Sequence, residues 1–280
     1  MEHQMEQALI EQFQTKLKNE EKSSATIEKY LRDIKSFYIF VEGKCVIDKN
    51  TVIAYKEHLI KRYAIASANS MLAALNQFFK VLGWFDCVVR ALKVQREAFR
   101  ARERELTKKE YLRLLAAAKQ MGNDRLYLLM ETICATGIRV SELPFITVES
   151  LRTARAQVSL KGKTRTVILP KELCKKLRKY VQEKQISSGS IFITRSGKPM
   201  DRSNILHEMK KLGKVAGVDV KKIFPHNLRH LFAVTYYKIE KNICHLADIL
   251  GHSNINTTRI YTMISCEEQS KQIKKLGLVV

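Results

Sequence analysis

The sequence lacks any run of about 18 consecutive apolar residues, the length that a membrane-spanning helix needs. Glu2 and Glu6 occupy the start of the chain, where a secretory signal peptide would be basic. The six cysteines include no Cys-x-x-Cys pair, and the seven histidines show no close metal-ligand spacing. These absences predict a cytoplasmic protein with reduced thiols, no membrane partner, no bound metal and no cofactor.

Proline and glycine are also scarce, with 4 and 11 among 280 residues, and no repeat or low-complexity tract occurs. Few helix breakers are typical of a compact, mainly helical protein. A hydrophobic content of 45% excludes a disordered chain. Because single domains usually have about 100 to 200 residues, the length favours two domains.

Acidic residues are few relative to basic ones: 28 Asp and Glu face 50 Lys and Arg, which gives a net charge of +22. Residues 101–280 carry +18 of this charge, and residues 1–100 carry only +4. Dense cationic charge attracts polyanions through its long-range field and through counterion release. The charge therefore predicts a polyanionic partner, either nucleic acid or an anionic membrane surface. The sequence has no basic amphipathic helix with a bulky apolar face separate from the core, which argues against the membrane.

The first part of the chain has apolar residues at helical spacing. This pattern predicts four helices, at residues 7–18, from residue 24 until Gly43 stops it, at 50–61 and at 66–82. The segment RALKVQREAFRARERE that follows is dense in charge, and is either a linker between domains or a helix extension. We expect a helical domain at residues 1–88, a linker at 89–104 and a second domain at 105–275.

The second domain begins with a capping box, in which Thr107 precedes Glu110 by three residues. The alternating segment QVSLKGKTRTVILP predicts a β-hairpin around Lys161, Gly162 and Lys163. A short strand is expected at 191–194. Apolar spacing predicts helices beginning at Thr107 and near 126–134, 171–184, 201–215, 226–239 and 243–250. The fold class is thus mainly α with a small β-hairpin.

Four segments of the second domain carry residues suited to chemistry on a phosphodiester. They are ATGIRVSEL around Arg139, the hairpin turn at Lys161, PHNLRH from Pro225, and LGHSNINTTRIYT, which includes Tyr261. No acidic metal cluster accompanies them, so fixed cations would have to stabilise charge on the phosphate oxygens. A tyrosine beside such cations is a candidate nucleophile.

Taken singly, each of these residues has an ordinary structural explanation, such as a solvated arginine, a charged hairpin tip or a packed tyrosine. Their joint occurrence in this order resembles the tyrosine recombinases, the phage integrase and Xer-like family. The family pattern is an arginine after Thr-Gly and before Ser-Glu-Leu, a hairpin lysine, His-x-Leu-Arg-His, Leu-Gly-His and a tyrosine nine residues later. Every part of it is present here.

The resemblance implies that Tyr261 is the nucleophile, which forms a 3′-phosphotyrosine bond. Arg139 and Arg229 then bind the scissile phosphate.

The remaining members of the site follow from the same resemblance. Lys161 is the implied general acid for the 5′-oxygen, with Lys163 as the alternative because the turn is one residue shorter than is common in the family. His226 assists proton transfer at the tyrosine. His252 hydrogen-bonds a phosphate oxygen, and Glu142 orients the first arginine.

In architecture, the resemblance implies a C-shaped DNA clamp made of a SAM-like core-binding domain and a catalytic domain. The implied partners are a double-stranded recombination site with inverted repeats and further copies of the chain, four of which act on two duplexes. The reaction that the resemblance implies needs neither metal nor ATP. The alternatives are a catalytically silent DNA-binding protein of the same fold and a type IB topoisomerase-like activity.

Overall fold

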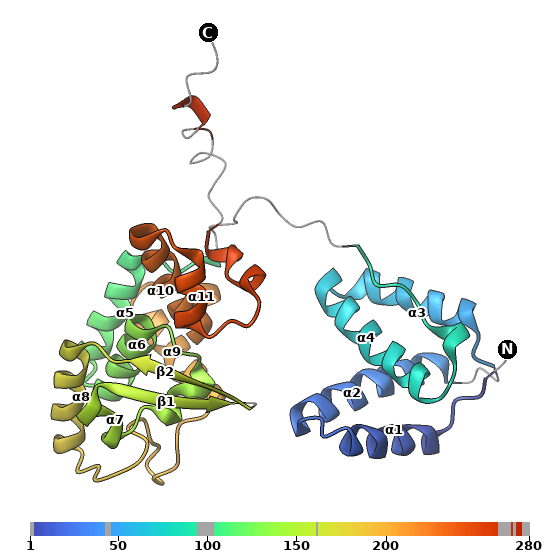
Figure 1. Cartoon of the computed structure of the whole chain (residues 1–280), viewed down its shortest axis with the longest axis horizontal. Coiled ribbons are helices and arrows are strands. Elements are labelled where there is room, and N and C mark those ends of the chain that lie inside the picture. Colours follow the sequence, from blue (N-terminus) through green and yellow to red (C-terminus); the bar gives the residue numbers. More distant parts are fainter. Residues whose placement is uncertain are drawn as a thin grey trace. The chain divides into compact units, whose positions relative to one another are not determined.

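The chain folds into two compact units, Met1–Arg96 and Glu97–Val280 (Figure 1). The structure is a computed structural model, and it describes residues 3–42, 46–93, 104–160, 162–262, 270 and 273–275. Most of the predicted linker, residues 94–103, lies outside the described residues. Whether this segment is a linker or a helix extension therefore stays a prediction. Within the described residues, no helix has both the length and the apolar character needed to cross a bilayer.

The described residues of the first unit form a bundle of four helices, as the apolar spacing predicts. Ser23 and Asp48 each begin a helix by accepting a hydrogen bond from a backbone N–H three residues later. Aromatic residues contribute to its core, with Phe13, Phe37 and Phe78 fully buried. The elements are α1 (Gln7–Asn19), α2 (Ser24–Val41), α3 (Lys49–Arg62), α4 (Ile65–Val81) and the short 3₁₀ helix η1 (Phe85–Cys87).

Two asparagines of α4 hold the chain that leaves this bundle. Asn76 bonds both the N–H and the C=O of Val89, at 2.9 and 2.7 Å, and Asn69 does the same for Leu92, at 2.7 and 3.0 Å. A side-chain amide offers one donor and one acceptor, so it can pair with an extended backbone as a neighbouring strand would. Residues 89–92 are therefore tied to the first unit.

The second unit is mainly helical, with one small antiparallel sheet of two strands among its described residues. The predicted capping box is confirmed: Thr107 and Glu110 bond each other's backbone N–H groups. The long helices are α5 (Lys108–Gln120), α6 (Asp124–Thr136), α8 (Lys171–Glu183), α9 (Arg202–Val215), α10 (Pro225–Glu240) and α11 (Ile243–Leu250). The shorter elements are α7 (Val148–Thr153) and the 3₁₀ helices η3 (Val140–Phe145), η4 (Val220–Lys222), η5 (Ile255–Thr257) and η6 (Arg259–Tyr261).

The predicted hairpin is present, with β1 (Arg155–Leu160) paired to β2 (Lys163–Ile168). Leu160 pairs with Lys163 across the turn, and Val158 pairs with Arg165. The strand expected at 191–194 is wrong: only Ile193 forms a bridge, to Pro199. The backbone here bonds different partners in turn, since Ile191 donates to Ile146 whereas Thr194 donates to Lys198, so no continuous ladder forms.

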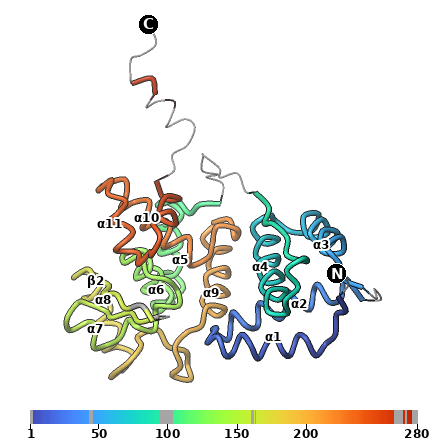
Figure 2. The backbone as a smooth tube through the Cα atoms, turned by 45° about the vertical axis from the view of Figure 1, so that its right-hand side comes forward, coloured from blue at the N-terminus to red at the C-terminus, as the bar shows by residue number. Residues whose placement is uncertain are grey.

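Helix α10 packs between α6 and α11, and this arrangement positions the predicted site residues (Figure 2). Gly137 ends α6 with φ +65°, in the left-handed region. A Cβ atom at this position would lie 2.4 Å from Phe232 Cδ1 and 3.0 Å from Leu250 Cδ2. A side chain at residue 137 would therefore push α10 and α11 away from α6.

Gly137→Ala is expected to destabilise the second unit through both backbone strain and this clash. Gly122→Ala is the matched control, because Gly122 has the same φ of +65° but nothing within 4 Å of a Cβ atom. The control should lose about 1 to 2 kcal/mol from the left-handed conformation alone, and Gly137→Ala about 1 to 3 kcal/mol more from overpacking. Chemical unfolding of both variants measures the difference, and equal losses would contradict the packing argument.

Candidate active site

Four segments of the second unit converge on one cluster of side chains. Arg139 follows α6, His226 and Arg229 lie in the first two turns of α10, His252 follows α11, and Tyr261 ends η6. Lys161, the sixth predicted site residue, lies outside the described residues. The structure describes the backbone of Lys163 but not its side chain, so the choice between the two lysines stays a prediction.

Arg229 is 1% exposed, and its guanidinium is held by backbone oxygens. Nη1 donates to the carbonyl of Gly137 at 2.6 Å, and Nη2 donates to the carbonyl of Leu250 at 2.8 Å. Burial, and then repulsion from Arg139, lower the pKa of Arg229 to about 10, so it stays charged at neutral pH. Across the described part of the chain, it forms no ion pair with a carboxylate. A buried cation of this kind favours an incoming anion.

Arg139 is fixed by Glu142, which lies three residues later in η3. The carboxylate accepts from the Arg139 backbone N–H at 2.8 Å and from Nη1 at 2.9 Å. Burial alone would raise the pKa of Glu142, but the hydrogen bond from the Arg139 backbone, together with the hydrogen bond and charge of Arg165, lowers it. The carboxylate is therefore ionised, and the Arg139 side chain is 40% exposed beside it.

His252 connects Arg229 to the segment that carries the tyrosine. Arg229 Nη2 donates to His252 Nε2 at 2.9 Å, so this nitrogen is the unprotonated one. The other ring nitrogen, Nδ1, then donates to Oγ1 of the fully buried Thr258 at 2.8 Å. Burial and the charges of Arg229 and Arg139 lower the pKa of His252 to about 4. At neutral pH, His252 is thus a neutral imidazole with an assigned tautomer.

The ring of Tyr261 is 3% exposed and lies between two histidines. It stacks on His252 with centroids 6.2 Å apart, and meets the edge of His230 at 5.1 Å. His230 thus packs against the ring of the candidate nucleophile. His226, at the start of α10, is exposed, and its pKa is lowered by desolvation and by the charges of Arg229 and Arg139.

The cluster has more positive than negative charge. Arg139, Arg165 and Arg229 surround one carboxylate, that of Glu142. Since His252 is neutral, these three arginines and one carboxylate have a net charge of +2, and Arg229 is the arginine among them that bonds no carboxylate. Guanidinium groups bind the oxygens of a phosphodiester well, because their donors are planar and forked. The arrangement can therefore bind a phosphate next to a tyrosine ring and a neutral histidine.

Acid is expected to destabilise the second unit from about pH 6.5 to about pH 4. The pKa of His252 is about 4 in the folded chain, against a usual value of 6.5. Between these values, the unfolded chain binds a proton that the folded chain does not, so the free energy of unfolding falls as the pH falls. The lowered pKa of His226 acts with the same sign.

Thermal unfolding measured across this pH range checks the expectation. His252→Gln should reduce the slope and leave the part due to His226. Identical slopes for the variant and the unmodified protein would show that His252 does not titrate as proposed.

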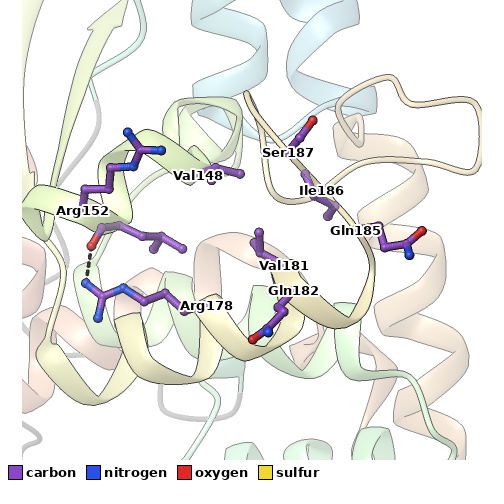
Figure 3. Close-up of a pocket in the computed structure, with 9 residues that line it drawn as sticks. Val148, Arg152, Arg178, Val181, Gln182, Gln185, Ile186 and Ser187 are labelled. Carbon is purple, nitrogen blue, oxygen red and sulfur yellow. Dashed lines mark hydrogen bonds between the residues drawn. The ribbon is translucent and has the colours of Figure 1, made fainter.

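Two other features of the molecule lie apart from this cluster. A groove of about 440 Å³ runs between α7 and α8, with Val148, Leu151 and Val181 on its walls (Figure 3). Arg178 crosses it to donate to the carbonyl of Leu151. The lining is mostly apolar and contains none of the predicted site residues. Of the two arginines that line it, Arg178 is already held by the backbone.

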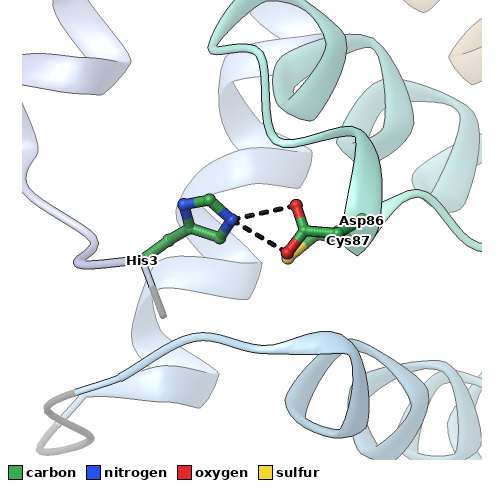
Figure 4. A group of neighbouring side chains, drawn as sticks. All are labelled: His3, Asp86 and Cys87. Carbon is green, nitrogen blue, oxygen red and sulfur yellow. Dashed lines mark hydrogen bonds and ion pairs between the residues drawn. The ribbon is translucent and has the colours of Figure 1, made fainter. Parts of the chain in front are cut away.

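In the first unit, His3, Asp86 and Cys87 bring potential metal ligands within 4.8 Å of one another (Figure 4). However, the Nε2 atom of His3 already donates to both carboxylate oxygens, at 3.0 and 3.1 Å, and the ring stacks on Trp84. Burial raises the pKa of Cys87 to about 11, so its thiol is protonated at neutral pH. These contacts anchor the start of the chain, and the group does not suit a metal ion.

The sequence missed two residues of the cluster, Arg165 and Thr258. Arg165 Nη2 donates to Glu142 Oε2 at 2.6 Å, and Thr258 fixes the tautomer of His252. The only sequence signal for Arg165 was its place in a strand beside the predicted lysine turn. Thr258 lies within a Thr-Thr-Arg run whose pattern singles out no position.

Comparisons with known proteins match both units. Residues 104–268 match the model of the phage integrase family, and residues 9–83 match the model of the SAM-like N-terminal domain of phage integrases. Tyrosine recombinase XerA of Thermococcus kodakarensis is 30% identical over 284 residues, which cover 97% of this chain and 96% of the relative.

Solved structures of tyrosine recombinases also match this chain. A crystal structure of XerA recombinase is 27% identical and matches with a TM-score of 0.53, covering 96% of this chain and 97% of that one. A lambda integrase tetramer bound to a Holliday junction is 19% identical and has a TM-score of 0.73, over 91% of this chain and 76% of that one. The latter likeness is one of fold alone.

Proposed function

Since the chain belongs to the phage integrase family and is a site-specific tyrosine recombinase, we propose that it cleaves and rejoins DNA through a 3′-phosphotyrosine intermediate on Tyr261. The observation that carries this proposal is the buried guanidinium of Arg229, which has an uncompensated charge next to His252 and the ring of Tyr261. A scissile phosphate would supply the missing anion.

In the proposed reaction, the Tyr261 oxygen attacks phosphorus, so a P–O(Tyr) bond forms as the P–O5′ bond breaks. The phenol proton passes to His226, whose lowered pKa keeps the imidazole neutral and able to accept it. Lys161 supplies a proton to the departing 5′-oxygen. A 5′-hydroxyl of the partner strand then attacks the phosphotyrosine and reverses these steps.

The two arginines stabilise the charge that develops on the non-bridging oxygens, and His252 orients Arg229 by accepting a hydrogen bond from its Nη2. Arg229 is held in place by backbone carbonyls and Arg139 by Glu142, so neither has to reorganise when the phosphate reaches its transition state. Fixed cations fill the role that a metal ion has in other phosphoryl transfers. No ATP is needed, because the covalent intermediate conserves the energy of the phosphodiester bond.

We propose double-stranded DNA with inverted repeats as the partner, and assembly of four copies on two duplexes in the cytoplasm. The charge of +18 on residues 101–280 supports a polyanionic partner. The tetrameric state of the lambda integrase structure supports the assembly.

The test uses a duplex selected from a random-sequence library by its binding to the protein, then footprinted and nicked next to the cleavage position. Cleavage at the nick releases a short 5′-hydroxyl fragment, so the covalent adduct cannot be resealed. We expect a protein–DNA species that survives denaturant, forms in EDTA without ATP, and maps to Tyr261 by mass spectrometry. Binding without any adduct would point to a catalytically silent DNA-binding protein. Relaxation of a supercoiled plasmid that lacks the selected site would point to a topoisomerase.

A further inference from the structure

Arg165 joins three parts of the second unit that are distant in sequence. It belongs to β2, yet its guanidinium leaves the hairpin: Nη2 donates to Glu142 Oε2 in η3 at 2.6 Å, and Nη1 donates to the carbonyl of Ile249 near the end of α11. The side chain is 16% exposed. A hairpin arginine that is only solvated would make neither contact.

Through Glu142, Arg165 acts on Arg139. One carboxylate oxygen, Oε1, accepts from Arg139 Nη1, and the other, Oε2, accepts from both the Arg139 backbone and Arg165. With both oxygens occupied, the carboxylate cannot rotate without breaking a charge-assisted hydrogen bond. The direction of the Arg139 side chain therefore depends on Arg165, although the two arginines do not bond each other.

The second contact of Arg165 is with the C-terminal end of α11. Its last carbonyls have no partner within the helix, and they carry the negative end of the helix dipole. The carbonyl of Ile249 accepts from Arg165, that of Leu250 from Arg229, and that of Gly251 from Arg139 at 3.4 Å. Three successive carbonyls thus hold three arginines, and His252 follows directly.

The close approach at Gly251 shows how tightly Arg165 fits. A Cβ atom on Gly251 would lie 2.5 Å from Arg165 Cδ and 2.8 Å from its Nε. The aliphatic part of the Arg165 side chain thus fills the space beside the end of α11. The position of this side chain and the position of residues 249–252 therefore depend on each other.

We propose that Arg165 is a positioning residue for strand cleavage, an inference that rests on the proposed function. By donating hydrogen bonds to both Glu142 and the Ile249 carbonyl, Arg165 fixes the direction of the Arg139 side chain. The same two bonds fix the position of the end of α11, which precedes His252. Lysine cannot replace it, because one ammonium group lacks the planar fork whose two nitrogens reach a carboxylate and a carbonyl at once.

The test measures single-turnover cleavage of the nicked duplex at saturating protein for Arg165→Met and Arg165→Lys. Because misplacing catalytic groups by about 1 Å costs about 10²-fold, both variants should cleave about 10²-fold more slowly. DNA affinity and its dependence on salt should be unchanged. If Arg165 bound a DNA phosphate directly, the slope of log affinity against log salt would instead fall by about 1, and the inference would be wrong.

Arg125 provides a matched control for stability. It also donates to a carboxylate, Glu208 at 2.8 Å, and to a backbone carbonyl, that of Ile193 at 2.9 Å, and its buried Nε lacks a hydrogen bond, as in Arg165. Arg125→Met should lower the unfolding temperature as Arg165→Met does, yet cleave at the unmodified rate. Equal slowing by the two variants would mean that stability alone explains the effect.

A double-mutant cycle with Glu142→Gln separates positioning from an independent role. If Arg165 acts through Glu142, the double variant should cleave faster than the product of the two single effects predicts, at a rate close to that of the slower single variant. Additive effects, or a full rate for Arg165→Lys, would overturn the inference. An unmodified protein that forms no adduct would instead refute the proposed function.

Discussion

Tyr261→Phe is expected to bind the DNA site with unchanged affinity and to form no covalent adduct. Phenylalanine keeps the ring that packs between His252 and His230, and the position is 3% exposed, so the packing is preserved. Only the oxygen that would bond to phosphorus is lost. The effect should therefore be complete loss of strand cleavage, measured as the denaturant-resistant species on the nicked duplex.

Tyr180→Phe is the control for this experiment. Tyr180 is likewise buried in the second unit, at 5% exposure, and lies on α8 among core residues. Its variant should form the adduct at the normal rate. If Tyr261→Phe still joined strands, the nucleophile would have to be another side chain, and the assignment of Tyr261 would be abandoned.

Helices with an apolar stripe were predictable to within about two residues at their ends, because burying one face imposes a period on the sequence. Caps such as Thr107 and Asp201 fixed several starts. The short elements η3 and α7 were not predicted, since one or two turns are too short to display a period. The segment 191–194 was apolar enough for a strand but lacked a continuous partner.

The active site, like the fold, was predictable from the sequence only in part. Residues of the predicted motif, such as Arg139, His252 and Tyr261, could be found because their order along the chain is distinctive, and the structure brings them together. The contacts between them were not predictable. Arg165 reaches Ile249 across 84 residues of sequence, and no local pattern encodes that distance.

Burial was the other property that the sequence did not reveal. An arginine with 1% exposure and no carboxylate among its described contacts would be an unstable element of an ordinary core. Arg229 is tolerated because the carbonyls of Gly137 and Leu250 solvate it, and these carbonyls come from the ends of two helices, α6 and α11. The fold thus holds a buried guanidinium in a fixed position without needing an anion to pair with it.

Arg229→Lys is expected to reduce single-turnover cleavage by about 10² to 10³-fold, the usual cost of removing one preorganised donor to a transition-state oxygen. Lysine keeps the charge, but its single nitrogen cannot bond the carbonyls of Gly137 and Leu250, His252 and a phosphate together. Arg229→Met should also be less stable by about 1 to 3 kcal/mol, because it leaves buried carbonyls unpaired. Rapid-quench cleavage and chemical unfolding measure the two effects.

Arg178→Lys distinguishes a catalytic arginine from a structural one. Arg178 also donates to a backbone carbonyl, that of Leu151, but lies at the groove between α7 and α8. Its variant should cleave at the unmodified rate. If Arg229→Lys cleaved equally fast while remaining folded, the buried guanidinium would serve only to bind the helix ends together. The charge left without an acidic partner beside Tyr261 would then need another anion, and the phosphate would have to be sought elsewhere on the second unit.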